Sequence, residues 1–149
     1  MKLENEFLYA EISEMGAEVI RIYDKENQRD ILWEGDPKYW KRHSPVLFPN
    51  VGKTYRNTVR IGGIQYPTSQ HGFARDTMFT CIKSSKDNAS FMILSNEEMK
   101  EVYPYDFELH ISYQLRGKEL EVEWQVKNRT AETMYFTIGG HPAFRFAEA

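Results

Sequence analysis

Hydrophobic and polar residues alternate with a period of two in the part of the chain from residue 107 to residue 127. Every second residue of Phe107–Leu115 is apolar, and the same alternation returns in Leu120–Val126. The short connection between the two runs contains Gly117, and glycine readily adopts the positive φ of a tight turn. The pattern therefore predicts a β-hairpin with one buried face, and it places Trp124 in the core.

Shorter apolar segments, separated by turn-forming residues, predict more strands. The expected strands are Phe7–Ile12, Ala17–Tyr23, Val59–Tyr66, Met78–Lys83, Ser90–Ser95 and Thr133–Ile138. Only Asp36–Trp40 and Asn96–Lys100 have helical signals, and each is long enough for a single turn. Many short strands without long helices between them predict an all-β fold, an antiparallel β-sandwich, with residues 1–149 in one domain.

The segment Arg42–Asp76 interrupts this rhythm of short strands. It contains three prolines, four glycines and two histidines, and it carries no clear alternation over most of its length. Long irregular segments inside a compact domain are more often functional than connecting segments of ordinary length. We therefore look for chemistry in this segment first.

Composition and charge exclude some classes of binding partner and indicate a cellular location. The formal net charge is −3 and no basic block occurs, which argues against binding to nucleic acid or to an anionic membrane. No apolar run approaches the roughly 20 residues of a membrane span, and the polar first residues do not resemble a signal peptide. The single cysteine, Cys81, has no partner for an internal disulfide and is expected to be a buried thiol. We expect a cytoplasmic location.

Two histidines stand where the backbone is unusual. His71 precedes Gly72 and lies close to Arg75, whose planar guanidinium offers several donors to a ligand. His141 follows two glycines and precedes Pro142, a sequence that could direct an imidazole into a cleft. Imidazole suits acid–base chemistry near neutral pH. The plainer interpretation is a loop histidine bonded to a nearby carbonyl in one case and an exposed histidine in a turn in the other.

Three segments, taken together and in order, resemble the aldose 1-epimerase (mutarotase) family, in particular its bacterial branch of uncertain sugar specificity. They are Tyr39–Gly52 (YWKRHSPVLFPNVG), Gln70–Asp76 (QHGFARD) and Gly139–Phe144 (GGHPAF). The residues Tyr103–Phe107, which lead into the hairpin, also follow the spacing of the family. The resemblance covers essentially the whole chain.

The resemblance implies part of a galactose mutarotase-like supersandwich that interconverts the α and β anomers of a hexose without a cofactor. The sugar ring opens and closes again on its other face. By motif position His141 would be the general acid and His71 would bind the sugar, together with Arg75. The family usually has an arginine where Lys53 stands, and lysine cannot give the same bidentate grip. Trp40 would either stack on the sugar or pack beneath the neighbouring loop.

The resemblance also implies a catalytic glutamate far downstream of His141. This chain ends at Ala149, so we expect the general base to be absent from it. No motif assigns that role to Glu148. If strands that complete the sheets are also absent, exposed sheet edges would favour self-association.

Other functions remain open on sequence grounds. A non-catalytic carbohydrate-binding domain is the main alternative, because the base is missing. A hexose 6-phosphate would suit the positive charges of Lys53, Arg56, Arg60 and Arg75. A metal enzyme built on His71 and His141 lacks the usual ligand spacings, and a nucleophilic hydrolase lacks the Gly-x-Ser-x-Gly motif.

Overall fold

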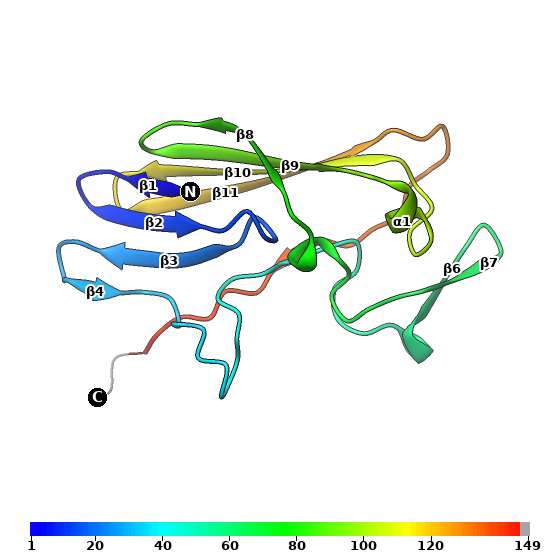
Figure 1. Cartoon of the computed structure of the whole chain (residues 1–149), viewed down its shortest axis with the longest axis horizontal. Helices are drawn as coiled ribbons and strands as arrows, with labels where there is room; N and C mark the ends of the chain where they lie inside the picture. The colour runs from blue at the N-terminus through cyan, green and yellow to red at the C-terminus, as the bar shows by residue number, and fades with distance from the viewer. Residues whose placement is uncertain (147–149) are drawn as a thin grey trace.

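The chain folds into two antiparallel four-stranded sheets whose apolar faces enclose the core (Figure 1). The computed structural model describes residues 1–146. The first sheet has the order β1 (Lys2–Glu4), β2 (Leu8–Ile12), β3 (Val19–Asp24), β4 (Arg29–Asp30). The second has the order β11 (Glu119–Asn128), β10 (Phe107–Arg116), β9 (Asn88–Leu94), β8 (Thr80–Ser84). The expectation of an all-β, antiparallel fold is confirmed.

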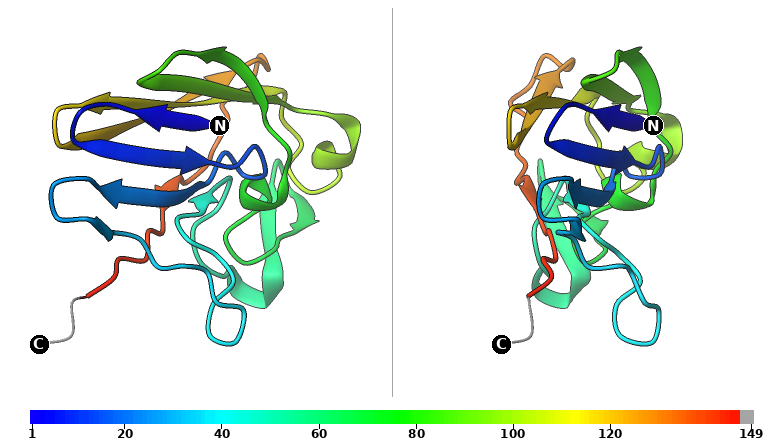
Figure 2. Two further views of the ribbon diagram at one scale, coloured as in Figure 1. Left: turned by 60° about the vertical axis from the view of Figure 1, so that its left-hand side comes forward. Right: turned by 90° about the vertical axis from the view of Figure 1, so that its left-hand side faces the viewer.

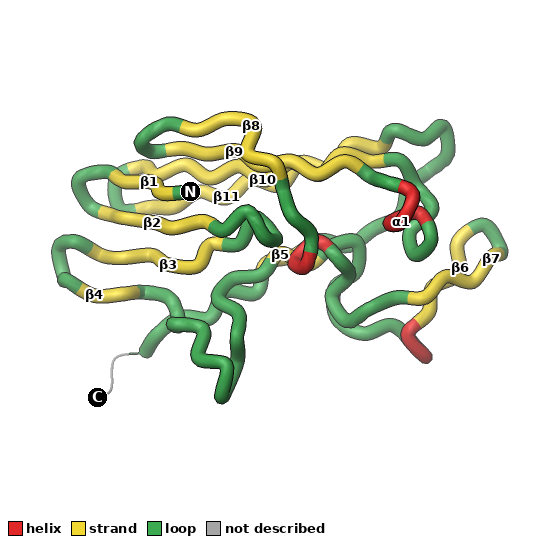
Figure 3. The backbone as a smooth tube through the Cα atoms, viewed as in Figure 1, coloured by secondary structure: helices red, strands yellow, loops and turns green. Residues whose placement is uncertain are grey.

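Two smaller sheets complete the fold. They pair β5 (Val46–Leu47) with β12 (Gly139–Gly140), and β6 (Thr58–Ile61) with β7 (Ile64–Pro67). Figure 3 shows β5 near the middle of the molecule and β6 and β7 at its lower right. Helical structure is limited to the single turn α1 (Glu97–Lys100) and two 3-10 turns, Tyr55–Asn57 and Ala74–Asp76. Within residues 1–146, no helix is long and apolar enough to cross a membrane. Figure 2 shows the β6–β7 hairpin and the chain around β5 on one side of the sheets.

The β10–β11 hairpin has the register that the alternation predicts. Ile111 pairs with Trp124 and Tyr113 pairs with Val122, so the apolar side chains of both strands share one face. On β10 these side chains are buried, because β10 lies inside its sheet and its apolar face covers the core. The Tyr113 hydroxyl also donates a hydrogen bond to the Ala17 carbonyl at 2.5 Å, which joins the second sheet to the first.

The core position expected for Trp124 is wrong. Trp124 points to the inner face, but 37% of its surface is exposed, and Val122 is 42% exposed. The reason is that β11 is the edge strand of its sheet and borders an open groove of about 420 Å³ between the two sheets. Trp124 packs against Gly140, where an added Cβ would lie 3.2 Å from its ring.

Two of the expected strands also differ from the structure. Val59–Tyr66 is a hairpin of β6 and β7 rather than one strand. Thr133–Ile138 is not a strand, because its polar groups bond the loop after β5. The Thr137 N–H donates to the Pro49 carbonyl and the Thr137 hydroxyl accepts from the Val51 N–H, both at 2.9 Å.

The alternation of apolar and polar residues did not predict the short strands β1, β4 and β5. Cys81 is half-buried rather than buried.

Candidate functional site

The strand pair β5–β12 carries His141. Gly139 and Gly140 pair with Leu47 and Val46, and the His141 N–H then donates to the Pro45 carbonyl at 3.1 Å. The Ala143 N–H donates to the His43 carbonyl at 2.9 Å, so main-chain hydrogen bonds hold the segment before and after His141, which is itself exposed to solvent.

The loop that carries His71 folds tightly over β5 and the residues that follow it. His71 has a φ of +70° and Gly72 a φ of +71°. At Gly72 the backbone approaches Phe48 so closely that an added Cβ would lie 2.2 Å from the Phe48 carbonyl oxygen. The same carbonyl accepts the N–H groups of Phe73 and Ala74. Only glycine permits this conformation and this approach together.

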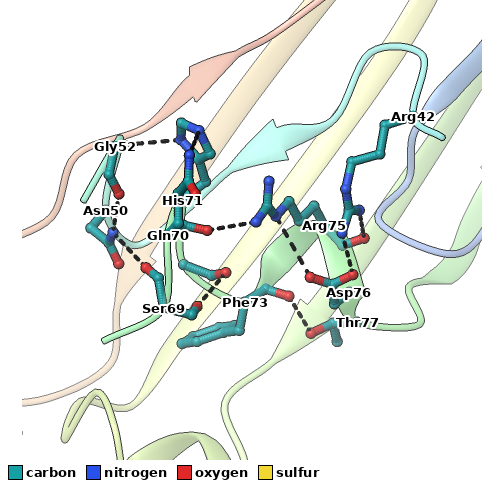
Figure 4. Close-up of polar contacts among 11 residues, drawn as sticks. Arg42, Asn50, Gly52, Ser69, Gln70, His71, Phe73, Arg75, Asp76 and Thr77 are labelled. Atoms are coloured by element: carbon teal, nitrogen blue, oxygen red, sulfur yellow. Dashed lines mark hydrogen bonds and ion pairs between the residues drawn. The ribbon is translucent and has the colours of Figure 1, made fainter. Parts of the chain in front are cut away.

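His71 and Gly52 share two hydrogen bonds, and one of them fixes the imidazole of His71 (Figure 4). The main-chain N–H of His71 donates to the Gly52 carbonyl at 2.9 Å. The main-chain N–H of Gly52 donates to the ring nitrogen Nδ1 of His71, also at 2.9 Å. A ring nitrogen that accepts a hydrogen bond carries no proton, so the neutral ring has its hydrogen on Nε2. His71 can therefore donate one hydrogen bond from Nε2 to a ligand.

The surroundings keep His71 neutral. Burial lowers the pKa of His71 below its ordinary value, and the positive charge of Arg75 lowers that pKa further. The neighbouring His141 and Arg42 act in the same direction. A histidine with these properties serves as a hydrogen-bond donor to a neutral ligand better than as a proton source.

The structure brings His71, His141 and Trp40 together, from three segments that are far apart in the sequence. The ring centroids of His71 and His141 are 6.1 Å apart, and those of Trp40 and His141 are 5.2 Å apart. Trp40 is half-buried, and its carbonyl accepts a hydrogen bond from Trp33 Nε1 at 2.8 Å. Two imidazoles and one indole ring thus border the same patch of surface.

Arg75 is already engaged by the protein. Its Nη2 donates to the Gln70 carbonyl at 2.7 Å, and its Nε lies 3.6 Å from the Asp76 carboxylate. Asp76 also pairs with Arg42 at 2.7 Å (Figure 4). The guanidinium of Arg75 therefore holds the His71 loop through Gln70, and only its remaining N–H groups can donate to a ligand. Lys53 follows Gly52, and its side chain is exposed.

A hollow of about 390 Å³ lies beside the His71 loop, with Gly72 and Ser69 in its wall. Its wall is mainly apolar and includes Phe73, Tyr103 and Tyr135. Asn50, Thr54, Thr68 and Ser69 add polar groups to the wall, but neither imidazole lines it, so the candidate site lies over the imidazoles rather than in this hollow. In the part of the chain that the structure describes, no three His, Cys, Asp or Glu side chains are grouped to hold a metal ion.

One residue of the site region was missed from the sequence. Glu18 is buried, with 8% of its surface exposed, and its carboxylate accepts the N–H groups of His43 and Ser44. The available signal was a carboxylate inside the mainly apolar run from Ala17 to Ile20. Glu148 lies outside the described residues.

Comparison with known proteins supports the family resemblance. A family model described as aldose 1-epimerase matches residues 1–149. The plasmid-encoded protein LacX of Lactococcus lactis subsp. lactis is 35% identical over an alignment 150 residues long, which covers 97% of this chain and 50% of LacX. A galactose mutarotase-like protein from Lactobacillus casei is 36% identical, with a TM-score of 0.96 over 99% of this chain and 50% of its own.

A galactose mutarotase related enzyme from Lactobacillus acidophilus gives a TM-score of 0.97 at 36% identity, over 99% of this chain and 49% of that chain. The chain thus spans about half the length of these relatives. The match of the family model over residues 1–149 and the likeness to these solved structures show that the protein belongs to the aldose 1-epimerase family and has the galactose mutarotase-like fold.

Proposed function

We propose that the protein is an aldose 1-epimerase-type isomerase that interconverts the α and β anomers of a hexose, with His141 as the general acid. The observation that carries the proposal is the pairing of two unlike imidazoles 6.1 Å apart. His71 is locked as a neutral donor by Gly52. His141 is exposed, and its ring makes no hydrogen bond to any residue among 1–146, so it is free to exchange protons with a ligand and with water.

In the proposed reaction, protonated His141 gives its proton to the ring oxygen of the sugar while a base takes the proton of the anomeric hydroxyl. The bond between the anomeric carbon and the ring oxygen breaks, and an open-chain aldehyde forms. Rotation of the aldehyde and the reverse proton transfers close the ring on the other face. Each positioned acid or base contributes a factor of about 10²–10⁴.

The other residues of the site bind the sugar in this proposal. His71 donates its Nε2 hydrogen to a sugar hydroxyl, and the ring of Trp40 lies against a sugar face beside His141. Lys53 and the free part of the Arg75 fork contact hydroxyls at the rim. The resemblance assigns the base to a glutamate downstream of the matched segments, and we give that role to no residue of 1–146.

The test is the rate of anomer interconversion of glucose and galactose, measured by NMR exchange. We expect a rate above that of the buffer, and we expect His141→Ala to remove a factor of about 10²–10⁴ of any acceleration. His110→Ala is the matched control, because that histidine lies on the outer face of β10 and bonds Glu108 at 2.9 Å. Equal rates for the protein and His141→Ala would refute the role of His141.

A carbohydrate-binding domain without catalysis is the second candidate. It is favoured by the fact that, among residues 1–146, the site brings together a binding histidine, His71, and a stacking ring, Trp40, without an assigned base. Under this alternative, hexoses shift the NMR signals of Trp40 and His71 but leave the exchange rate at the buffer value.

A phosphorylated hexose is a further substrate to test, because Arg75 and Arg42 place positive charge next to His71. Glucose 6-phosphate should then bind more tightly than glucose at low salt, and its advantage should shrink as ionic strength rises. An equal affinity for both sugars at low salt would count against phosphate recognition.

A further inference from the structure

Glu18 is a buried carboxylate with two main-chain partners. Among the residues that the structure describes, Glu18 is the one buried residue with a charged side chain, and 8% of its surface is exposed. Its Oε1 accepts the N–H of His43 at 2.6 Å and the N–H of Ser44 at 2.8 Å. Hydrogen bonds from main-chain N–H groups to an ionised carboxylate are stronger than neutral ones, so they offset part of the free energy lost when the charge is buried.

The segment that Glu18 holds is the one to which His141 is attached. The His43 carbonyl accepts the N–H of Ala143 at 2.9 Å, and the Pro45 carbonyl accepts the N–H of His141 at 3.1 Å. The N–H groups of His43 and Ser44 thus bond to Glu18, while carbonyls of the same segment bond to the main chain on each side of His141. A shift of this segment would carry His141 with it.

Glu18 is itself anchored to the sheets. It adjoins Ala17, whose carbonyl accepts the Tyr113 hydroxyl of the second sheet at 2.5 Å. Its negative charge also acts on Arg75, where it opposes the lowering of the Arg75 pKa by burial. Glu18, Arg42, His43 and Arg75 line one hollow of about 240 Å³. The carboxylate therefore connects the rigid core to the backbone of His141 and also faces the arginine that braces the His71 loop.

We propose that Glu18 is a positioning residue that sets the place of the His141 imidazole relative to Trp40 and His71, through its hydrogen bonds to the N–H groups of His43 and Ser44. Its importance for turnover rests on the proposed function, whereas its structural action does not. Glu18 does not reach the sugar in this proposal. It acts through the main chain of the residues that carry the acid.

Two conservative variants separate the effect of the length of the Glu18 side chain from the effect of its negative charge. Glu18→Asp keeps the charge but withdraws the carboxylate by one methylene, and Glu18→Gln keeps an oxygen acceptor at the same reach but removes the charge. We expect Glu18→Asp to move the ring-proton shifts of His141, which Trp40 influences at 5.2 Å, and to speed amide exchange at His141 and Ala143 about 10- to 100-fold. Glu18→Gln should retain both properties of the original protein.

The control is Ile12→Val, a buried substitution at the end of β2 that lowers global stability without removing a partner of the Glu18 carboxylate. If Glu18→Asp leaves the His141 signals and amide exchange as they are in Ile12→Val, the positioning role is refuted. If Glu18→Gln disturbs His141 and Glu18→Asp does not, charge rather than reach is responsible and the proposal also fails. Neither readout uses a sugar, so a lack of epimerase activity would refute the proposed function and leave this inference standing.

Discussion

His71 adopts a conformation that is unfavourable for a residue with a side chain. A φ of +70° is uncommon outside glycine, although histidine tolerates it better than branched residues do. The strained backbone is held by the two bonds to Gly52 and by the Arg75 bond to the Gln70 carbonyl. Strain of this kind, maintained by its neighbours, is typical of functional positions.

The lowered pKa of His71 leads to a prediction about pH. Because the folded state favours the neutral imidazole, its contribution to stability is present above the ordinary histidine pKa of about 6.5 and is lost as the pH falls through the folded pKa. Arg75→Gln removes the nearest positive charge and should raise the pKa of His71, measured by NMR titration of its ring protons. Arg42→Gln should raise it less.

Arg116→Gln is the control for this titration, because Arg116 lies at the end of the hairpin and pairs with Glu121. A pKa of His71 that is unchanged in Arg75→Gln would contradict the electrostatic explanation. A pKa that rises equally in Arg116→Gln would show a general effect of net charge instead.

At the scale of elements, the close approach of Gly72 to Phe48 fixes the His71 loop against the residues that follow β5. Gly72→Ala combines a positive φ with a Cβ 2.2 Å from the Phe48 carbonyl oxygen. We expect the free energy of unfolding to fall by ~3 kcal/mol or more, measured by urea denaturation, and the Gly52 amide to lose protection from exchange.

Gly63→Ala is the matched control for this loss of stability. Gly63 also has a positive φ, +84°, but nothing lies within 4 Å of an added Cβ. The control should therefore lose only the ~1–2 kcal/mol that a left-handed backbone costs a residue with a Cβ. Equal losses at the two glycines would mean that the contact with Phe48 is unimportant.

Local pattern predicted the elements whose partners are close in sequence. The β10–β11 hairpin was predictable because its alternation and its turn around Gly117 are both local. Thr133–Ile138 also alternates, but its partners lie in the loop near Pro49, about 85 residues earlier, and only the tertiary structure reveals them. Short strands such as β5, with two residues, carry too little pattern to be detected.

The site was predictable in part. His71 and His141 could be identified from their motifs, but nothing local sets the 6.1 Å between their rings. The Gly52 bond that fixes the tautomer of His71 is likewise a contact between separate segments. Glu18 was overlooked because an acidic residue in a strand normally faces solvent, and its buried bonds to the main chain depend on the loop after Trp40.

At the scale of the whole molecule, β11 forms the edge of its sheet and, among residues 1–146, pairs only with β10. It is ten residues long, and its inner face exposes Val122 and Trp124 beside the groove between the sheets. Long apolar edge strands readily pair with further strands, and a net charge of −3 gives little repulsion between copies. We expect the chain to self-associate through β11, with a sedimentation coefficient that rises with protein concentration.

Val122→Lys should reduce this association, because it places a charge on the exposed apolar face without removing a fully buried side chain. Gln125→Lys adds the same charge to the polar face of the same strand and serves as the control. A sedimentation coefficient that does not change with concentration would contradict the expectation. Equal effects of the two variants would show that the face of β11 is irrelevant.

The imidazole of His71 and the main chain of His141 are held by main-chain groups, at Gly52 and at Pro45. Main-chain groups of this kind are present whatever side chain a residue carries, so substitutions at Lys53 or Gln70 leave these two attachments in place. Under the proposed function, exchanging Lys53 or Gln70 would then change the contacts offered to the sugar while the attachments of the two histidines stay as they are.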